Sequence, residues 1–280
     1  MGKLKNYGNF IKVEHSLFSL PLILCGSFLA VWGLPDLKLL CLIIIAAVGA
    51  RTAALAINRI LDAKIDVLNP RTKDRELPSG KINITEAIVI TLSGLVIYLI
   101  SAYFICDLVL YLSPIPLVVF IIYPLMKRFT PFCHFGVGLG LALAPLAGWV
   151  AVTCSLSNLT APMLLFLFTL FWVAGFDIIY ATLDEKFDKE KGIYSIISVY
   201  GKDKGLLISA VLHILAFLSI FVLYLLIFKS YISLLFLLIT GVFLYLEHKK
   251  SENVDLAFFK INIVVGFSVF IFVLSGIYLP

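Results

Sequence analysis

The chain has 280 residues, of which 61% are hydrophobic and only 14% are charged. A soluble globular domain typically has about 25% charged residues, so this composition and the mean hydropathy of +1.07 argue against a soluble protein. We therefore expect an integral membrane protein that contacts membrane lipid. The formal net charge of +5 is small, and we expect no nucleic-acid partner and no obligate protein partner.

Nine apolar segments have the length and hydropathy of membrane spans, which take roughly 20 residues each. In chain order they lie near 16–34, 38–58, 84–104, 108–125, 133–153, 161–181, 204–227, 231–247 and 257–279. The pattern predicts an all-α bundle of about nine transmembrane helices, which forms a single membrane domain over residues 1–280. No small-residue cleavage pattern follows the first span, so we expect a retained helix rather than a signal peptide.

The lysine and arginine residues predict how the bundle is oriented. Nearly all of the 22 basic residues fall in segments that share one side of the membrane with the N-terminus. The opposite loops hold only Lys38 and Lys229, and Arg51 lies within the second span. Because cytoplasmic loops carry an excess of Lys and Arg, the N-terminus and the two long polar loops, 66–83 and 183–203, are predicted to be cytoplasmic.

The second span carries a stripe of polar residues toward its cytoplasmic end. Asp62 and Asp66 lie four residues apart, so they share one face of a helix. Arg51 and Asn58 precede Asp62 on the same stripe. An arginine within a span costs about 2.5–3.5 kcal/mol, so Arg51 is expected either to face a pocket as an anion contact or to pair with a structural acid.

Basic residues gather in two of the cytoplasmic segments. The loop at 66–83 contains three that can clamp a diphosphate: Arg71, Lys73 and Arg75. Guanidinium groups bind phosphate through two parallel hydrogen bonds, but ordinary positive-inside charge explains these residues equally well. Lys127 and Arg128, after the fourth span, are likewise either a membrane anchor or a further diphosphate contact.

One helical face at the end of the sixth span carries four polar residues: Asp177, Tyr180, Asp184 and Asp188. Asp177 lies in apolar sequence and is costly there unless it is neutralised. We expect it to pair, for instance with Arg51, or to position a lysine or an acceptor hydroxyl.

Four carboxylates that converge from two helices repel one another unless a cation lies between them. Hard divalent cations with oxygen ligands, above all Mg²⁺, suit such a site. A Mg²⁺ ion held by few carboxylates completes its shell with water and substrate phosphate, which predicts an enzyme for a phosphorylated, lipid-like substrate. The predicted metal ligands, and hence the predicted catalytic residues, are Asp62, Asp66, Asp184 and Asp188.

Three further features suggest packing rather than chemistry. The five cysteines show no metal-ligand or redox spacing, and we expect small hydrophobic residues rather than disulfide partners. His15, which opens the first span, is expected to be an interfacial or packed residue. The small residues of the fifth span predict close helix contacts: Gly136, Gly138, Gly140, Ala144 and Gly148.

The acidic clusters resemble the two signature motifs of the UbiA-superfamily intramembrane aromatic prenyltransferases. The segments that carry this resemblance are Asn58–Asp66, Arg71–Gly80, Lys127–Arg128 and Tyr180–Asp188. The chain departs from the usual pattern at Arg59, where many members have Asp, and at Glu76, where Pro is common. Residues 14–21 and 176–182 look most like bacterial 4-hydroxybenzoate polyprenyltransferase-like proteins, which implies the bacterial inner membrane.

The resemblance implies Mg²⁺-dependent transfer of a polyprenyl group from an allylic polyprenyl diphosphate to a ring carbon of an aromatic acceptor. The acceptor would be 4-hydroxybenzoate or a related quinone precursor. The implied substrate-binding residues are Arg51, Asn58, Arg71, Lys73, Arg75, Lys127, Arg128, Asp177 and Tyr180. A polyprenyl tail would lie in a cavity that is open to lipid.

Several alternatives remain open on the sequence. Within the superfamily, the acceptor can instead be a naphthoate for menaquinone synthesis, haem or a glycerol phospholipid precursor. A cation-coupled transporter is a different class with intramembrane carboxylates. It is disfavoured because these acids lie at helix ends beside long loops, rather than at the midplane of broken helices. The signature of a CDP-alcohol phosphotransferase is absent from the acidic clusters.

Overall fold

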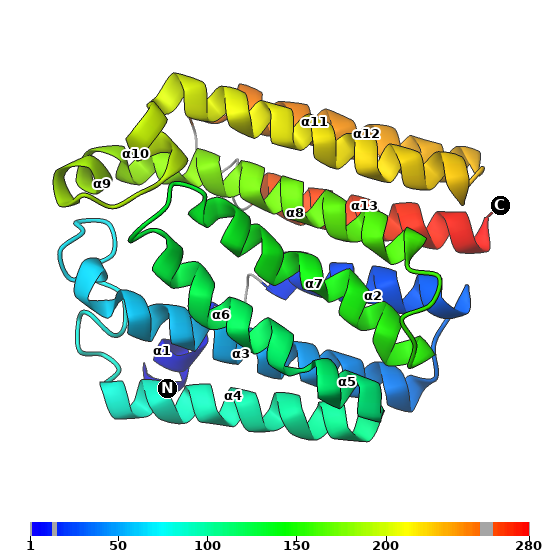
Figure 1. The fold of residues 1–280 in the computed structure, drawn as a ribbon, viewed down its shortest axis with the longest axis horizontal. Helices are drawn as coiled ribbons and strands as arrows, with labels where there is room; N and C mark the ends of the chain where they lie inside the picture. Colours follow the sequence, from blue (N-terminus) through cyan, green and yellow to red (C-terminus); the bar gives the residue numbers. More distant parts are fainter. Residues whose placement is uncertain (1, 13–15, 253–259, 280) are drawn as a thin grey trace.

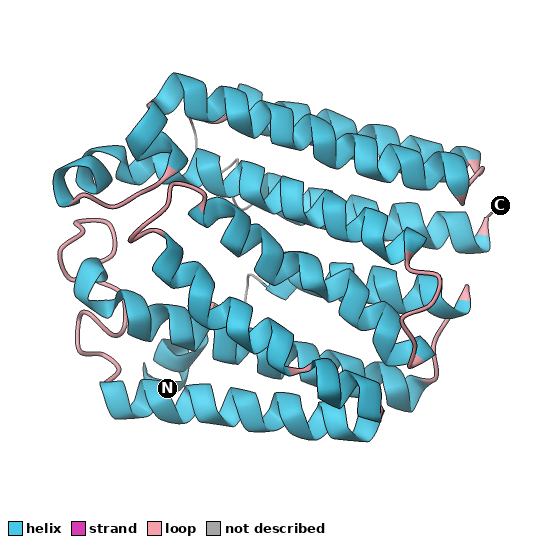
Figure 2. Ribbon diagram, in the orientation of Figure 1, coloured by secondary structure: helices cyan, strands magenta, loops and turns pink. Residues whose placement is uncertain are grey.

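The computed structural model describes residues 2–12, 16–252 and 260–279. Within these ranges every regular element is a helix (Figure 2), which confirms the predicted all-α class. His15 falls outside the described residues.

The helices of the first half are α1 (Gly2–Phe10), α2 (Ser16–Val31), α3 (Leu37–Asp66), α4 (Ile84–Ile105), α5 (Asp107–Leu112), α6 (Pro114–Met126) and α7 (Cys133–Thr153). Those of the second half are α8 (Thr160–Ala181), η2 (Thr182–Asp184), α9 (Glu185–Lys191), α10 (Ile196–Tyr200), α11 (Lys202–Leu226), α12 (Tyr231–Lys249) and α13 (Asn262–Tyr278).

Seven segments of the described chain are long and apolar enough to cross a membrane. The first and last predicted spans correspond to shorter apolar helices, 19–31 and Asn262–Tyr278, so the expected count of about nine is approximate. The fourth span consists of α5 and α6, which meet at Ser113. Pro114 explains this break, because proline lacks the N–H that would continue the hydrogen bonds of the α-helix.

The two long polar segments lie at the same end of the bundle (Figure 1). We call this the loop end; it is formed by residues 67–83 and 182–201. The expected loop at 183–203 is wrong in detail, since this segment folds into α9, α10 and the first residues of α11. The first acidic cluster is entirely helical, because α3 continues to Asp66.

A disulfide between Cys106 and Cys154 lies at the opposite end of the bundle, which we call the disulfide end. The expectation that the cysteines are unpaired is therefore wrong for these two residues. Their separation of 48 positions gave no signal, because the disulfide joins the junction of α4 and α5 to the end of α7. Cys25 is a free thiol buried in the core, as expected of a small hydrophobic residue.

Close backbone contacts hold the helices that surround the site. A Cβ added at Gly148 of α7 would lie 2.1 Å from the carbonyl oxygen of Ile23 in α2, and one at Gly138 would lie 2.6 Å from that of Leu170 in α8. Small residues permit such approaches in membrane bundles, which confirms the packing prediction at both positions. Gly140 is the exception, because it lines a cavity instead.

Buried polar groups join α8 to the C-terminal helices. The indole N–H of Trp172 donates to Asn262 at 2.8 Å, and Asn262 donates to the fully buried Glu247 at 3.1 Å. Nearby, the rings of His213 and His248 are hydrogen-bonded at 2.9 Å. Because buried polar groups are costly when unpaired, these contacts fix α11, α12 and α13 against α8.

We expect Gly148→Ala to lower the melting temperature of the purified protein, because the new methyl group would meet the α2 backbone at 2.1 Å. Overpacking of this kind costs about 1–3 kcal/mol. Gly140→Ala is the matched control on the same helix, since its nearest contact would be 3.9 Å away. Equal melting temperatures for the two variants would contradict the close approach of α2 and α7.

Candidate active site

A polar cavity of about 220 Å³ opens at the loop end between α3, α8 and the connecting segments. We call it the polar chamber. It is lined by all four aspartates of the two sequence clusters: Asp62, Asp66, Asp184 and Asp188. The structure thus brings together two pairs of acids that are more than a hundred residues apart in the chain.

Cations neutralise the two acids of α3. Lys127, which follows α6, forms an ion pair with Asp62 at 2.6 Å. Arg75 reaches both carboxylate oxygens of Asp66 through one nitrogen, at 2.9 Å each. Asn58 donates to Asp62 at 3.2 Å from one turn earlier. Both acids are only 4% exposed, and a carboxylate buried this deeply is costly unless it is paired.

Asp184 receives the densest set of contacts in the chamber. Arg71 donates to both of its oxygens, through Nε at 2.9 Å and through a second, shorter bond, and Asn69 donates at 2.9 Å. The same guanidinium donates to the Tyr180 hydroxyl at 2.6 Å and lies 4.8 Å from the centre of that ring. Burial opposes the charge on Arg71, but the bond to Asp184 and the nearby Tyr180 raise its pKa overall.

The predicted helical face from 177 to 188 is interrupted. The chain tightens into the 3₁₀ turn η2 before α9 begins, so Asp184 and Asp188 do not lie on one continuous α-helix. Both still line the polar chamber, because the turn carries the chain across its mouth. Asp188 is 9% exposed.

The arrangement suits a metal that is only partly held by protein. Among the described residues, no three His, Cys, Asp or Glu side chains are grouped closely enough to hold one ion. Mg²⁺ in proteins is commonly held by one or two carboxylates, with water and substrate phosphates as its other ligands. Each acidic pair can supply that number, and the surrounding arginines and lysine can bind phosphate.

Two of the predicted basic residues lie outside the chamber. Lys73 is exposed and does not line the polar chamber. Arg128 donates to the carbonyl oxygen of Leu61 at 2.6 Å, which fastens the segment after α6 to α3. The structure therefore brings Arg71, Arg75 and Lys127 to the acids but not these two.

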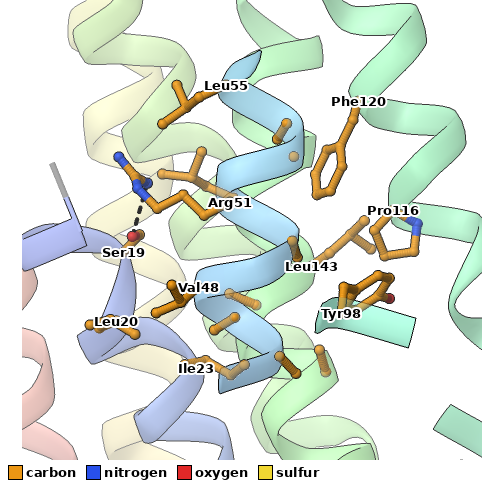
Figure 3. A pocket seen from close by; sticks show the side chains of 18 of the residues that line it. Ser19, Leu20, Ile23, Val48, Arg51, Leu55, Tyr98, Pro116, Phe120 and Leu143 are labelled. Carbon is orange, nitrogen blue, oxygen red and sulfur yellow. Dashed lines mark hydrogen bonds between the residues drawn. The ribbon is translucent and has the colours of Figure 1, made fainter. Parts of the chain in front are cut away.

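A second cavity, of about 280 Å³, continues from the polar chamber into the bundle. We call it the apolar chamber; its wall is mostly aliphatic and aromatic (Figure 3). The two cavities share Tyr123, Val137 and Asp177. Arg51 lies in this apolar wall and donates to Ser19 at 2.9 Å, so it faces a pocket, as one of the two interpretations predicted.

Asp177 is hydrogen-bonded to His134 of α7, whose Nδ1 lies 2.7 Å from the carboxylate. Its partner is therefore this histidine and not Arg51, the example given from the sequence. The sequence analysis missed His134 because it precedes Asp177 by 43 residues on a different helix. The position of His134 at the start of α7, directly after the Lys127–Arg128 segment, was the one available signal.

These features define a helical membrane protein with a carboxylate-lined chamber that continues into an apolar one. The chain belongs to the UbiA prenyltransferase family, whose model matches residues 19–274, and it is a prenyltransferase.

Individual relatives agree with this assignment. A 4-hydroxybenzoate octaprenyltransferase of Vesicomyosocius okutanii is 32% identical over 258 residues, which cover 89% of this chain and 91% of the relative. The apo structure of a UbiA homolog from Aeropyrum pernix K1 is 31% identical, with a TM-score of 0.81 over 94% of this chain and 97% of that one. A UbiA homolog from Archaeoglobus fulgidus, solved with DMAPP and Mg²⁺, shares the fold with a TM-score of 0.71 and 16% identity, over 98% and 100% of the two chains.

We expect Arg71→Gln to release the segment at 67–83, because Arg71 ties it to Asp184 and Tyr180. Loss of hydrogen bonds to a charged group costs about 1.5–3 kcal/mol, so the open state should be populated at least about tenfold more. Tryptic cleavage after the exposed Lys73 should be faster by the same factor. Lys189→Gln, which removes an exposed ion pair with Glu185, is the control. Equal cleavage rates would show that Arg71 does not hold the segment.

Proposed function

We propose that this prenyltransferase moves a polyprenyl group from an allylic polyprenyl diphosphate to a ring carbon of an aromatic acceptor, with Mg²⁺ as cofactor. The observation that carries the proposal is the junction of the two chambers. A polyprenyl diphosphate is itself an anionic head joined to an apolar tail. A chamber of carboxylates and cations that opens into an apolar cavity matches both parts of that molecule.

The polar chamber is where the diphosphate would bind. Asp62, Asp66, Asp184 and Asp188 are the proposed Mg²⁺ ligands. The Archaeoglobus homolog was solved with DMAPP and Mg²⁺, which supports Mg²⁺ and an allylic diphosphate as ligands of this chain. Bound Mg²⁺ would supply positive charge that neutralises the leaving diphosphate.

The chain's own cations would also help to neutralise the leaving diphosphate. Arg71, Arg75 and Lys127 now pair with aspartates, and a diphosphate with its metal would compete for both partners. We propose that these cations turn to the phosphate oxygens while the aspartates turn to the metal. The guanidinium of Arg71 can then grip phosphate through two hydrogen bonds.

The apolar chamber is where the prenyl tail would lie. Burial of the tail contributes about 0.8 kcal/mol per CH₂ group, so a long prenyl tail is more stable in the apolar chamber than in water. The aromatic wall excludes water from the carbon at which the C–O bond ionises, and aromatic faces stabilise the allylic cation.

The acceptor is proposed to be a phenolic aromatic carboxylate such as 4-hydroxybenzoate. The name of the Vesicomyosocius relative supports this choice, and Arg51 in the apolar wall can bind the carboxylate. A naphthoate acceptor for menaquinone synthesis carries the same groups on a larger ring. The pocket lining does not favour one of these acceptors over the other.

The loop end is proposed to face the cytoplasm, in a bacterial inner membrane. The positive-inside pattern supports this orientation, and so does the disulfide between Cys106 and Cys154 at the other end. Thiols stay reduced in most cytosols, whereas disulfides persist outside them. Both chambers are formed within one chain, so we propose that no obligate protein partner is needed.

We expect Asp62→Ala and Asp184→Ala to abolish prenyl transfer while the protein still inserts and folds. Loss of one preorganised electrostatic group typically costs about 10²–10³ in rate, and these residues are proposed to hold the metal. Turnover is measured on purified protein whose folding is checked by size-exclusion chromatography. Glu190→Ala, at an exposed position of α9, is the matched control. Full activity in either aspartate variant would contradict the metal site.

The acceptor is tested with radiolabelled geranyl diphosphate and Mg²⁺, with 4-hydroxybenzoate or 1,4-dihydroxy-2-naphthoate as the second substrate. We expect label to pass to one aromatic acceptor, and EDTA to stop the transfer until excess Mg²⁺ restores it, because the metal neutralises the leaving group. A reaction without acceptor is the control. Binding of the diphosphate without transfer to any aromatic compound would reject this acceptor class.

A further inference from the structure

Asp177 is placed where the two chambers meet, and it has a specific histidine partner. Its carboxylate lies 2.7 Å from Nδ1 of His134. The His134 side chain is 3% exposed, whereas that of Asp177 is 23% exposed and lines both chambers. The carboxylate thus lines both chambers, whereas the nearly buried imidazole lines the polar chamber alone.

The hydrogen bonds fix which nitrogen of His134 carries its proton. The backbone N–H of Ile196 points at Nε2, at a distance of 3.3 Å. That N–H belongs to the first residue of α10, where no carbonyl of the helix can accept it, so Nε2 acts as the acceptor. A histidine whose Nε2 accepts carries its proton on Nδ1, and it donates to Asp177 as a neutral ring.

Asp177 lies close to where the proposed function places the reacting carbon. The prenyl carbon that ionises joins the diphosphate to the tail, so it must lie where the polar chamber gives way to the apolar one. Three aspartates that pair with cations lie in the polar chamber, where the diphosphate would bind: Asp62, Asp66 and Asp184. Asp177 is partnered by a histidine rather than by a lysine or arginine, and it lines the junction itself, so its carboxylate lies close to the reacting carbon.

We propose that Asp177, oriented by His134, is the base that accepts the proton lost from the aromatic ring. This inference rests on the proposed function. The C–O bond of the donor breaks, and the diphosphate leaves with the electron pair. A C–C bond forms between the prenyl carbon and the acceptor ring. The C–H electron pair at that ring carbon restores aromaticity, and the proton moves to the Asp177 carboxylate, from which it passes to water in the polar chamber.

The roles of the two residues differ. Asp177 is the catalytic residue, because it receives the proton directly. His134 is a positioning residue that acts through Asp177. Glutamine can replace both of its contacts, since its amide N–H₂ can donate to Asp177 while its carbonyl accepts from Ile196. Alanine replaces neither contact, so a comparison of the two variants shows whether the hydrogen bonds of His134 are needed.

The test measures the primary deuterium isotope effect on transfer from geranyl diphosphate to 4-hydroxybenzoate that carries deuterium ortho to its hydroxyl. We expect His134→Ala and Asp177→Asn to slow transfer by about 10²-fold or more, the usual contribution of a general base. The remaining reaction should show an isotope effect larger than that of the wild type, because proton removal has become slow. The KM for geranyl diphosphate should change by less than about twofold, and His134→Gln should recover most of the rate.

Each outcome decides the matter. A slow Asp177→Asn variant without a larger isotope effect, or a raised KM in place of a lowered kcat, would overturn the assignment and make the residue a binding or structural group. Equal losses in His134→Gln and His134→Ala would overturn the positioning role. If the wild-type protein transfers no prenyl group to any aromatic acceptor, the proposed function itself fails and this inference fails with it.

Discussion

The candidate active site depends on ion pairs that neutralise buried carboxylates at the loop end of an apolar helix bundle. Each buried charge would cost several kcal/mol without a partner, so the fold must bring cations to the acids. Lys127 comes from the turn after α6, and Arg71 and Arg75 come from the segment after α3. These contacts join elements that share no regular packing, and they give the loop end its shape.

The same ion pairs constrain how a substrate can bind. A divalent metal and a diphosphate arrive with nearly balanced charge, so they can take over the carboxylates and the cations together. Binding of either alone would leave one set without partners in a partly buried place, which is unfavourable. The chamber is therefore suited to accept donor and metal as one unit, and the bidentate grip of Arg71 on Asp184 is the contact that must exchange.

The sequence predicted the parts of this protein that follow from local spacing. The apolar segments gave the helices, and the fourfold spacing of Asp62 with Asp66 placed both acids on one face of α3. Contacts between helices were harder to predict, because they depend on side-chain packing that no local sequence pattern shows. The pair of Asp177 with His134 and the disulfide of Cys106 with Cys154 both join helices far apart in the chain.

The short helices after α8 were missed for a related reason. The sequence of α9 is polar and rich in charge, which is typical of a loop, and α10 has only five residues. Both are held by contacts with the rest of the loop end. Ser195 caps α10 through the backbone of Ser198, and the N–H of Tyr194 donates to the carbonyl of Lys127 at 2.8 Å. Such tertiary contacts override weak local propensity.

The polar residues lie at different depths below the loop end, and their depths predict how the two substrates would be arranged in the cavity. Arg51 precedes Asp62 by eleven residues, or about 16 Å along α3. Because Asp177 lines both chambers and Arg51 lines only the apolar one, Arg51 lies deeper than Asp177. A phenolic carboxylate bound by Arg51 would then hold its ring toward Asp177, with the ionising carbon between the ring and the diphosphate. An acceptor without an anionic group would lack this anchor, and its ring would not be held at the junction of the chambers.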